Sequence, residues 1–282
     1  DRGVRVLPGI GTSHYGGFYY DGNHRFRANN WLEQGREQLR FLDARGNRLR
    51  DTICPTQPEN QRWLREGARW LFSEMPRLGG ANLENGDWMS CQCPDCQRAR
   101  ANPDNDPNYY FDMMNTQLPI IEEAWKLLPG AWMTYATYTG FNTEEIWKRT
   151  DKAQVRSKVP RFVSQYPERA VCQWTYTFMV DGWGRQPEAA VRAKWPAGLR
   201  PPTRHSIGLL HQGSQWHDSD IWWTKSPRGE ATGQRYVDVS ELIRYSCSRC
   251  HQEGLEGIEI EGEVSDESRA NELNYLAFEE CT

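Results

Sequence analysis

Several features that define other classes of protein are missing from this sequence of 282 residues. It holds no run of about 20 apolar residues that would span a bilayer, and no predicted strand leads into the Gly-x-Gly-x-x-Gly turn that binds nucleotide phosphates. No repeat or low-complexity linker divides it, and its eight unevenly spaced cysteines are too few for a disulfide scaffold. These absences argue against a membrane span, a nucleotide-binding sheet and a repeat protein.

The sequence also lacks a large excess of charge of one sign. The 34 basic and 38 acidic residues leave a formal net charge of -4, without a long block of like charges, so we expect no nucleic-acid partner. Aromatic residues are abundant by contrast, with 13 Trp and 12 Tyr. Aromatic faces in this number fill a core or line a site that stacks against flat ligands such as sugars.

Short apolar strands alternate with helical periods, a pattern typical of βα units around a parallel sheet. We expect six strands, within residues 4–10, 78–84, 131–140, 169–179, 205–213 and 254–264. Six units fall short of the eight that close a (β/α)8 barrel. The sequence therefore predicts an α/β fold of the TIM-barrel type, as one catalytic domain over residues 1–282 that spans the third to eighth strands. A doubly wound sheet is the alternative.

One predicted strand brings a carboxylate to its end. In Gly-Gly-Ala-Asn-Leu-Glu, Ala81 and Leu83 share one face while Asn82 and Glu84 share the other, so Glu84 points inward at the carboxyl end. Asp87 follows in the next loop.

The last predicted strand shows the same alternation, because Ile258 and Ile260 alternate with acids at Glu259, Glu261 and, one position beyond Gly262, Glu263. Such acids either lie in water on an edge strand or form a pair with Glu84 across a pocket, since burying an unpartnered acid is costly. A carboxylate pair suits glycoside hydrolysis, in which one carboxyl group protonates the leaving oxygen and another attacks or activates water.

Aromatic and histidine side chains near the strand ends are the candidates for binding a sugar. Each is individually more typical of a core, but together they favour a binding surface. They are Trp132, Tyr135, Tyr138, Trp174, Tyr176, His211, Trp216 and His217.

Three cysteines follow the Glu84 strand closely. Cys91, Cys93 and Cys96 form C-x-C-x-x-C, a spacing that presents several thiolates to one zinc ion. Cys54, just before the helix that leads to this strand, is the first choice for a fourth ligand. Because thiol-rich sites leave no open position, we expect a structural zinc or a disulfide here, and no cofactor for catalysis.

A second motif, C-x-x-C-H at Cys247, Cys250 and His251, lies late in a predicted helix. In a barrel it would lie at the opposite end from the first cluster, so a joint four-thiolate site is geometrically awkward. Ordinary helix-packing cysteines are the simpler interpretation, because no axial ligand accompanies the motif to support haem attachment.

Residues 2–17 resemble the strand of family 20 glycoside hydrolases, the β-hexosaminidases, that reads R-G-I-x-V-I-P-E-I-D-x-P-G-H. Residues 53–76 are similar to that family's L-C-P-S-N-P-E and the helix after it. Residues 78–100 are similar to its H-I-G-G-D-E strand and to the C-P-x-C-Q of bacterial members. The resemblance covers about the first hundred residues. It implies a barrel whose third strand opens this sequence, with an additional N-terminal barrel segment or domain as a partner.

The resemblance also implies roles for individual residues. Counted back from Cys93, Glu84 occupies the place of the general acid, and His14 approximates the family's histidine. Leu83 replaces the aspartate that orients the substrate's acetamido group, so a second carboxylate is expected, with Asp87 or Glu261 as candidates and Glu263 nearby. Alignment on the glycine pair instead would place Ala81 and Asn82 in the two acidic positions.

Three functions follow from these observations. The first is a glycoside hydrolase that acts on a glycan by carboxylate acid and base chemistry, and for it a secreted or periplasmic location is favoured over the cytoplasm. The second is a carbohydrate-binding barrel without catalysis. The third is a zinc-stabilised protein of another function.

Overall fold

The computed structural model describes residues 5–14, 16–18, 23–84, 90–102, 109–136, 165–178, 205–211, 240–252, 254–260 and 275–281. The chain divides into two compact units. Unit 1 is made of Asp1–Thr139 and Ser157–Val171, and unit 2 of Gly140–Arg156 and Cys172–Thr282. Both contain parallel strands accompanied by helices, which is the α/β class that the sequence predicts.

Three parallel strands form the sheet of unit 1, in the order β1 (Gly9–Gly11), β4 (Gly80–Glu84) and β5 (Trp132–Ala136). Gly11 aligns with Glu84 across one edge of β4, and Asn82 aligns with Thr134 across the other. The central strand β4 is therefore flanked on both sides, and its last residue lies at the carboxyl end of the sheet.

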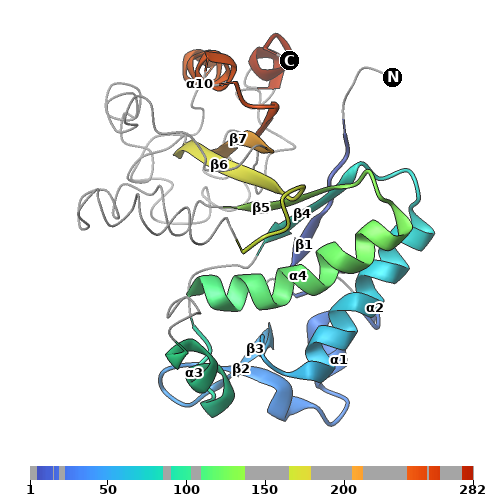
Figure 1. Cartoon of the computed structure of the whole chain (residues 1–282). Coiled ribbons are helices and arrows are strands. Elements are labelled where there is room, and N and C mark those ends of the chain that lie inside the picture. The colour runs from blue at the N-terminus through green and yellow to red at the C-terminus, as the bar shows by residue number, and fades with distance from the viewer. Residues whose placement is uncertain are drawn as a thin grey trace, which may run out of the picture. The chain divides into compact units, whose positions relative to one another are not determined.

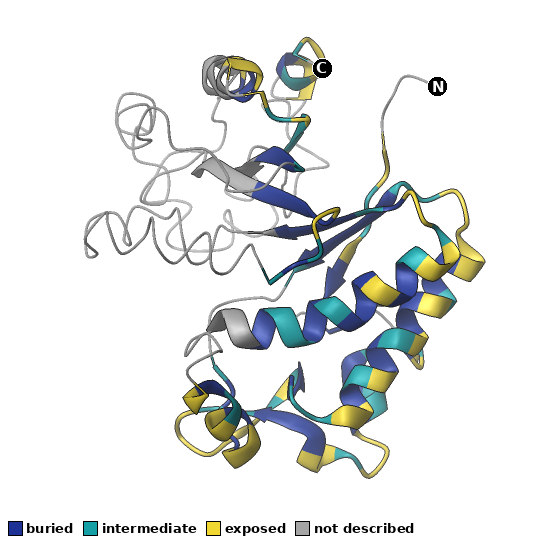
Figure 2. Ribbon diagram, viewed as in Figure 1, coloured by how far each residue is buried: buried dark blue, intermediate teal, exposed yellow. Residues whose placement is uncertain are grey.

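Two long helices, α2 (Pro58–Glu74) and α4 (Tyr109–Leu127), lie side by side next to this sheet (Figure 1). Their buried residues form continuous stripes (Figure 2). On α2 this stripe includes Trp63, Leu64, Ala68 and Leu71, as predicted. Met75 is instead 48% exposed, because the helix ends at Glu74 and Met75 is its C-cap residue.

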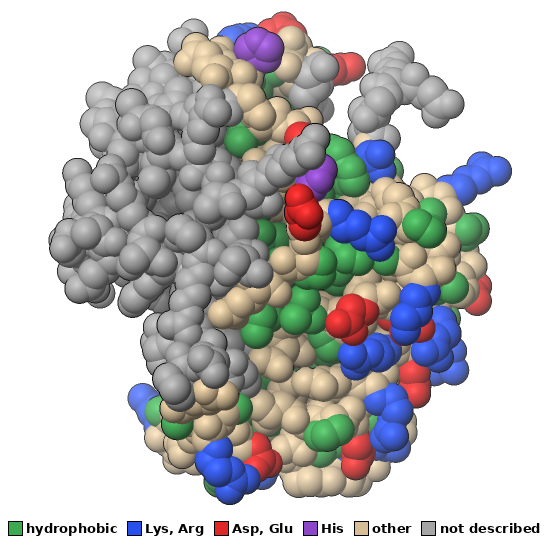
Figure 3. Space-filling model, viewed as in Figure 1, with side chains coloured by type: hydrophobic (Ala, Val, Ile, Leu, Met, Phe, Trp, Pro, Cys, Tyr) green, Lys and Arg blue, Asp and Glu red, His purple; other side chains and the backbone are tan. Residues whose placement is uncertain are grey.

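Ion pairs join the outer faces of α2 and α4. Arg65 pairs with Glu122 at 3.1 Å, and Arg69 pairs with Glu123 at 2.9 Å. Lys126, on the same helix as Glu123, adds a second cation at 2.7 Å. Basic and acidic side chains accordingly intersperse over these helices (Figure 3).

A small subdomain that the sequence did not predict lies between β1 and α2. It contains α1 (Ala28–Leu32), the short 3-10 helix η1 (Glu37–Leu39), and the antiparallel pair β2 (Arg40–Leu42) and β3 (Arg48–Ile53). The turn between β2 and β3 closes on Asp43, whose carboxylate accepts the backbone N–H groups of Arg45 and Asn47. These hydrogen bonds, with that of Asn47 first, lower the pKa of Asp43. A further helix, α3 (Pro94–Ala101), follows β4.

Unit 2 holds the parallel strands β6 (Val171–Phe178), β7 (Ser206–His211) and β8 (Gly257–Ile260) in that order. Helix α10 (Ser240–Gln252) precedes β8, and residues 275–279 form another helical segment.

All six predicted strands are present, and the strands within each described set of three run parallel. β1 begins at Gly9, later than predicted. Closure into a barrel and a single domain remain predictions. Within the described ranges, the helices are all too short or too polar to cross a bilayer.

Candidate functional site

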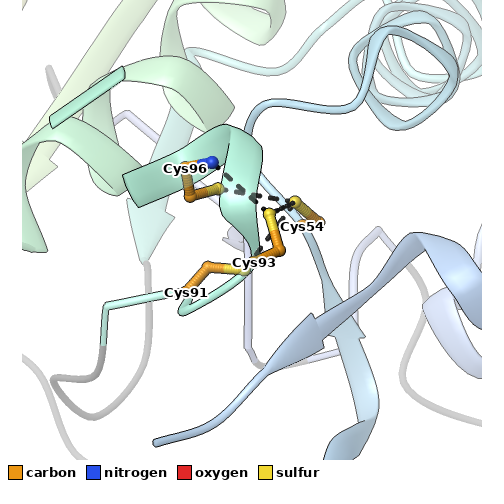
Figure 4. A group of neighbouring side chains, drawn as sticks. All are labelled: Cys54, Cys91, Cys93 and Cys96. Atoms are coloured by element: carbon orange, nitrogen blue, oxygen red, sulfur yellow. Dashed lines mark hydrogen bonds between the residues drawn. The ribbon is translucent and has the colours of Figure 1, made fainter. Parts of the chain in front are cut away.

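Four cysteines from three segments converge beside the β2–β3 pair (Figure 4). Cys54 follows β3, Cys91 and Cys93 lie in the segment before α3, and Cys96 lies in the first turn of α3. Their Sγ atoms all lie within 4.8 Å of one another. The Sγ atom of Cys54 is 3.5 Å from that of Cys93, 3.5 Å from that of Cys96 and 3.7 Å from that of Cys91.

These sulfur separations suit one tetrahedral metal ion. Thiolates that each lie at about 2.3 Å from a zinc ion are about 3.8 Å apart. Cys54 therefore joins the C-x-C-x-x-C motif in space, as the sequence predicts. We refer to Cys54, Cys91, Cys93 and Cys96 as the thiol quartet.

Local sequence explains how the quartet is assembled. Cys93 is the N-cap residue of α3, and its sulfur accepts the backbone N–H of Cys96 at 3.4 Å, while Pro94 starts the helix without a donor to lose. The backbone N–H of Leu42 donates to Cys91 Sγ at 3.5 Å. The Thr56 hydroxyl lies 3.1 Å from Cys96 Sγ. Donors of this kind stabilise negative charge on sulfur.

Each quartet side chain is at most 8% exposed, and with Phe41 they form the buried core of this region. Hydrogen bonds from the Cys54 and Cys96 thiols lower the pKa of Cys91 to about 4. The same contacts raise the pKa of Cys54, through Cys91, and of Cys96, through Cys54 and Cys91. The cluster thus favours one thiolate and resists further negative charge, unless a cation compensates it.

A buried ion pair fixes the backbone of Cys91. Arg100 Nη1 lies 2.8 Å from Asp112 Oδ1, and Asp112 Oδ2 accepts the backbone N–H of Cys91 at 2.7 Å. Arg100 also donates to the carbonyl oxygen of Cys91. Burial raises the pKa of Asp112 to about 7, although these contacts oppose that shift. The sequence analysis missed both residues, and the position of Arg100 one helical turn after Cys96 was the available signal.

Glu84 is half-buried at the carboxyl end of β4. Asn82 Nδ2 donates to Glu84 Oε1 at 3.0 Å, so the two side chains share one face as predicted. The Thr134 hydroxyl donates to Asn82 Oδ1 at 3.1 Å and orients this amide. Ala81 and Leu83 are fully buried, in keeping with the opposite face.

His14 is buried and packs against Phe41, a neighbour of the thiol quartet. It is 9% exposed, its Nδ1 lies 2.8 Å from the Ser13 hydroxyl, and its ring meets the edge of Phe41 at a centroid distance of 4.7 Å. Phe41 packs among the quartet cysteines. His14 thus has a packing role, which does not by itself place it on a substrate.

The structure corrects the expected placement of two aromatic residues. Tyr135 aligns with Leu83, is buried, and stacks on Tyr166 with 3.8 Å between ring centroids. The Tyr166 hydroxyl in turn donates to Gln117 of α4, so this stack belongs to the core between sheet and helix. Trp132 is the first residue of β5, at the end of the sheet away from Glu84, where Arg5 covers its ring.

In unit 2, Gln173 of β6 donates to the carboxylate of Glu259 on β8. The side chains of Gln173 and Glu259 therefore lie on the same face of the sheet of unit 2. Cys247 and Cys250 are buried, as expected for helix packing, while His251 is exposed.

Three of the remaining candidates lie on strands of unit 2, and the others lie outside the described residues. Trp174 and Tyr176 lie on β6, and His211 ends β7. The structure describes the backbone of these three residues but not their side chains. The candidates outside the described residues are Asp87, Tyr138, Trp216, His217, Glu261 and Glu263.

No protein-family model and no curated protein sequence matches the chain. Among solved structures, the catalytic domain of a beta-amylase from Paenibacillus polymyxa is similar with a TM-score of 0.49 and 8% identity, over 99% of this chain and 83% of that chain. A likeness of this extent assigns no family.

Proposed function

We propose that the chain is a glycoside hydrolase of the (β/α)8-barrel type, a divergent relative of family 20, with Glu84 as its general acid. The position of Glu84 carries this proposal. A half-buried carboxyl group ends the central strand of a parallel sheet, and that end is where barrel enzymes hold their catalytic groups. A glycan substrate and a secreted or periplasmic location belong to the same proposal.

The surroundings of Glu84 suit proton donation. Asn82 engages Oε1, which leaves Oε2 as the oxygen to approach a glycosidic oxygen. On the neighbouring strand, Gly11 aligns with Glu84 and Gly9 with Asn82, so no side chain from β1 covers this face. A general acid must come within hydrogen-bond reach of the leaving oxygen, and the glycines of β1 on this face favour that approach.

A second carboxylate would attack the anomeric carbon or activate water. Glu261 and Asp87 are the candidates. Glu261 is a candidate because the sequence alternates Ile258 and Ile260 with Glu259 and Glu261, a pattern that in an extended strand turns the acids to one face. The distance from Glu84 to this partner would decide between retention and inversion, at about 5 Å or about 6.5–9.5 Å respectively.

The thiol quartet supports the proposal that the protein also holds a structural zinc ion. Four buried sulfurs at mutual distances near those of a tetrahedral site leave no open position for substrate. Zinc would also supply the positive charge that four adjacent thiolates need. It would complete the small buried cluster around the cysteines, in which Phe41 is the one fully buried residue of another type.

Hydrolysis of a panel of aryl and natural glycosides tests the enzymatic proposal. For a poor leaving group, Glu84→Gln is expected to lower turnover by about a hundredfold or more and to leave sugar binding intact, because it removes only the proton donor. Activated leaving groups should lose much less. Glu66→Gln, at an exposed position of α2, is the control. Unchanged turnover in Glu84→Gln together with a loss in Asp87→Asn would identify Asp87 as the acid.

Metal analysis tests the zinc proposal independently. One zinc ion per chain is expected, lost in Cys54→Ser and retained in Cys172→Ala, which changes a buried cysteine outside the quartet. A wild-type chain that is purified and refolded with zinc but carries none would contradict it.

A sugar-binding protein without catalysis is the second candidate. Leu83, Gly9 and Gly11 favour it, since they stand where the resembling family carries acids. The same glycoside panel distinguishes the two, because a binding protein would retain saturable sugar affinity without turnover.

A further inference from the structure

Two helical segments of unit 2 meet at a pair of thiols. Arg244 of α10 donates to Glu280, beside the segment 275–279, at 3.0 Å. Cys247 lies one helical turn beyond Arg244, and Cys281 directly follows Glu280. This ion pair joins the two segments beside the two cysteines, and the Cys281 thiol is one of the neighbours that raise the pKa of Cys247, after burial. Both segments are seen at the red end of the colour scale in Figure 1.

The packing around these thiols holds them in place. Ile243 and Ala277 are buried on the two segments, and Cys281 Sγ lies 3.1 Å from the carbonyl oxygen of Ala277. Cys247 is buried and Cys281 is half-buried, and both are free thiols. Within the described part of the chain, the thiol quartet is the group with metal-site geometry, and Cys247 and Cys281 do not belong to it.

We propose that Cys247 and Cys281 are a disulfide-forming pair that cross-links α10 to the C-terminal helical segment, with a low-molecular-weight disulfide as the oxidant. The Cys281 thiolate attacks one sulfur of that disulfide, which breaks its S–S bond and releases one small thiol. Cys247 loses its proton and attacks Cys281 Sγ, forming the protein disulfide and expelling the second small thiol. Two protein thiols are oxidised and one small disulfide is reduced to two thiols.

The order of these steps follows from exposure. Cys281 is the more accessible sulfur, and burial raises the pKa of Cys247, so Cys281 meets the oxidant first. Cys250 is the competitor, because it lies one turn from Cys247 on the same helix and is also buried. The cross-link would fix the helix that precedes β8, the strand that carries Glu259. It does not depend on the proposed hydrolase activity.

Peptide mapping tests this pair on the folded, full-length, zinc-loaded chain. The chain is incubated with oxidised glutathione, quenched in acid, alkylated after denaturation and digested with trypsin. Cleavage after Arg244, Arg249 and Arg269 places the three cysteines in separate peptides, 245–249, 250–269 and 270–282. The expected product is peptide 245–249 joined to peptide 270–282, and it should persist in Cys250→Ser and be absent in Cys281→Ser.

Thermal unfolding gives a second readout. Oxidation should raise the Tm by about 3 °C or more in the wild type and in Cys250→Ser, and leave Cys281→Ser unchanged. The proposal is overturned if peptide 245–249 joins 250–269 instead, or if Cys247 and Cys281 are both alkylated after oxidation that converts an exposed reference thiol. If Cys281→Ser does not fold, the peptide map of the oxidised wild type still decides between these outcomes.

Discussion

Arg100 and Asp112 form a buried ion pair with 2.8 Å between Nη1 and Oδ1, and together they hold both backbone hydrogen-bonding groups of Cys91. The side chains are 8% and 0% exposed, so water can replace neither partner. This ion pair joins α3 to α4, and both of its side chains also bind the backbone of Cys91 in the thiol quartet. The geometry of a quartet cysteine therefore depends on two residues that bind no metal themselves.

Arg100→Met is expected to lower the free energy of unfolding by about 3 kcal/mol or more, because it leaves the Asp112 carboxylate buried without its cation. It should also speed the transfer of the proposed zinc ion to a chelator, since Cys91 loses a backbone contact. Arg98→Met on the same helix is the matched control. Its pair with Asp95 is exposed, so a change within about 0.5 kcal/mol is expected. Equal effects of the two substitutions, measured by urea unfolding and chelator competition, would argue against the clamp.

If the proposed hydrolase activity is present, Asn82→Ala should reduce turnover through the position of the Glu84 carboxylate. The substitution removes the 3.0 Å hydrogen bond to Oε1 and leaves Glu84 itself in place. We expect kcat to fall by about tenfold, with a smaller change in KM, because the carboxyl group loses a donor that orients it. Thr134→Val, which removes the donor to Asn82 Oδ1, should give a milder version of the same effect. A kcat equal to that of wild type in both variants would argue against this positioning role.

The sequence analysis located the side chains of Glu84 and Cys54 correctly for a physical reason, while their roles remain predictions. Alternation along a strand is local, so the shared face of Asn82 and Glu84 could be predicted without knowledge of the fold. Cys54 was predicted because the C-x-C-x-x-C motif supplies only three of the four ligands of a tetrahedral thiolate site, so a fourth cysteine had to come from elsewhere in the sequence.

The parts that were missed depend on contacts distant in sequence or on overlooked turns. Asp112 interrupts an apolar helix, and nothing in the helix itself indicates that Arg100 neutralises it. The β2–β3 pair is rich in exposed arginine, so no apolar alternation marks it, although Asp-Ala-Arg-Gly-Asn at residues 43–47 is a recognisable turn. Tyr135 was expected in a sugar-binding site because binding groups cluster at the carboxyl ends of barrel strands. Its alignment with Leu83 instead turns its side chain toward α4.

Glu123 should make stability depend on pH. Lys126 and then Arg69 lower its pKa below the ordinary value, so its contribution is present above about pH 4.5 and is lost as the pH falls through the lowered pKa of the folded state. At pH 7, Glu123→Gln is expected to lower the free energy of unfolding by about 1 kcal/mol, a modest value because both cations are largely exposed. The difference from wild type should shrink below about pH 4. Glu122→Gln, whose carboxylate is more exposed, should show a smaller difference, and a gap that persists at low pH would contradict the electrostatic origin.

Gly80→Ala is expected to destabilise the pairing of β4 and β5 strongly. Gly80 begins β4 with a φ of +155°, and a Cβ atom there would lie 1.8 Å from the carbonyl oxygen of Trp132 on β5. That obstacle is backbone within the strand pairing, so no side-chain rotation relieves it, and the two strands must separate where they first meet. We expect a loss of about 3 kcal/mol or more in urea unfolding. Gly130→Ala provides the control, because a Cβ atom at Gly130, just before β5, would meet no heavy atom within 4 Å. If the two variants unfold at the same urea concentration, the close approach of β4 and β5 at Gly80 is not a feature of the folded chain.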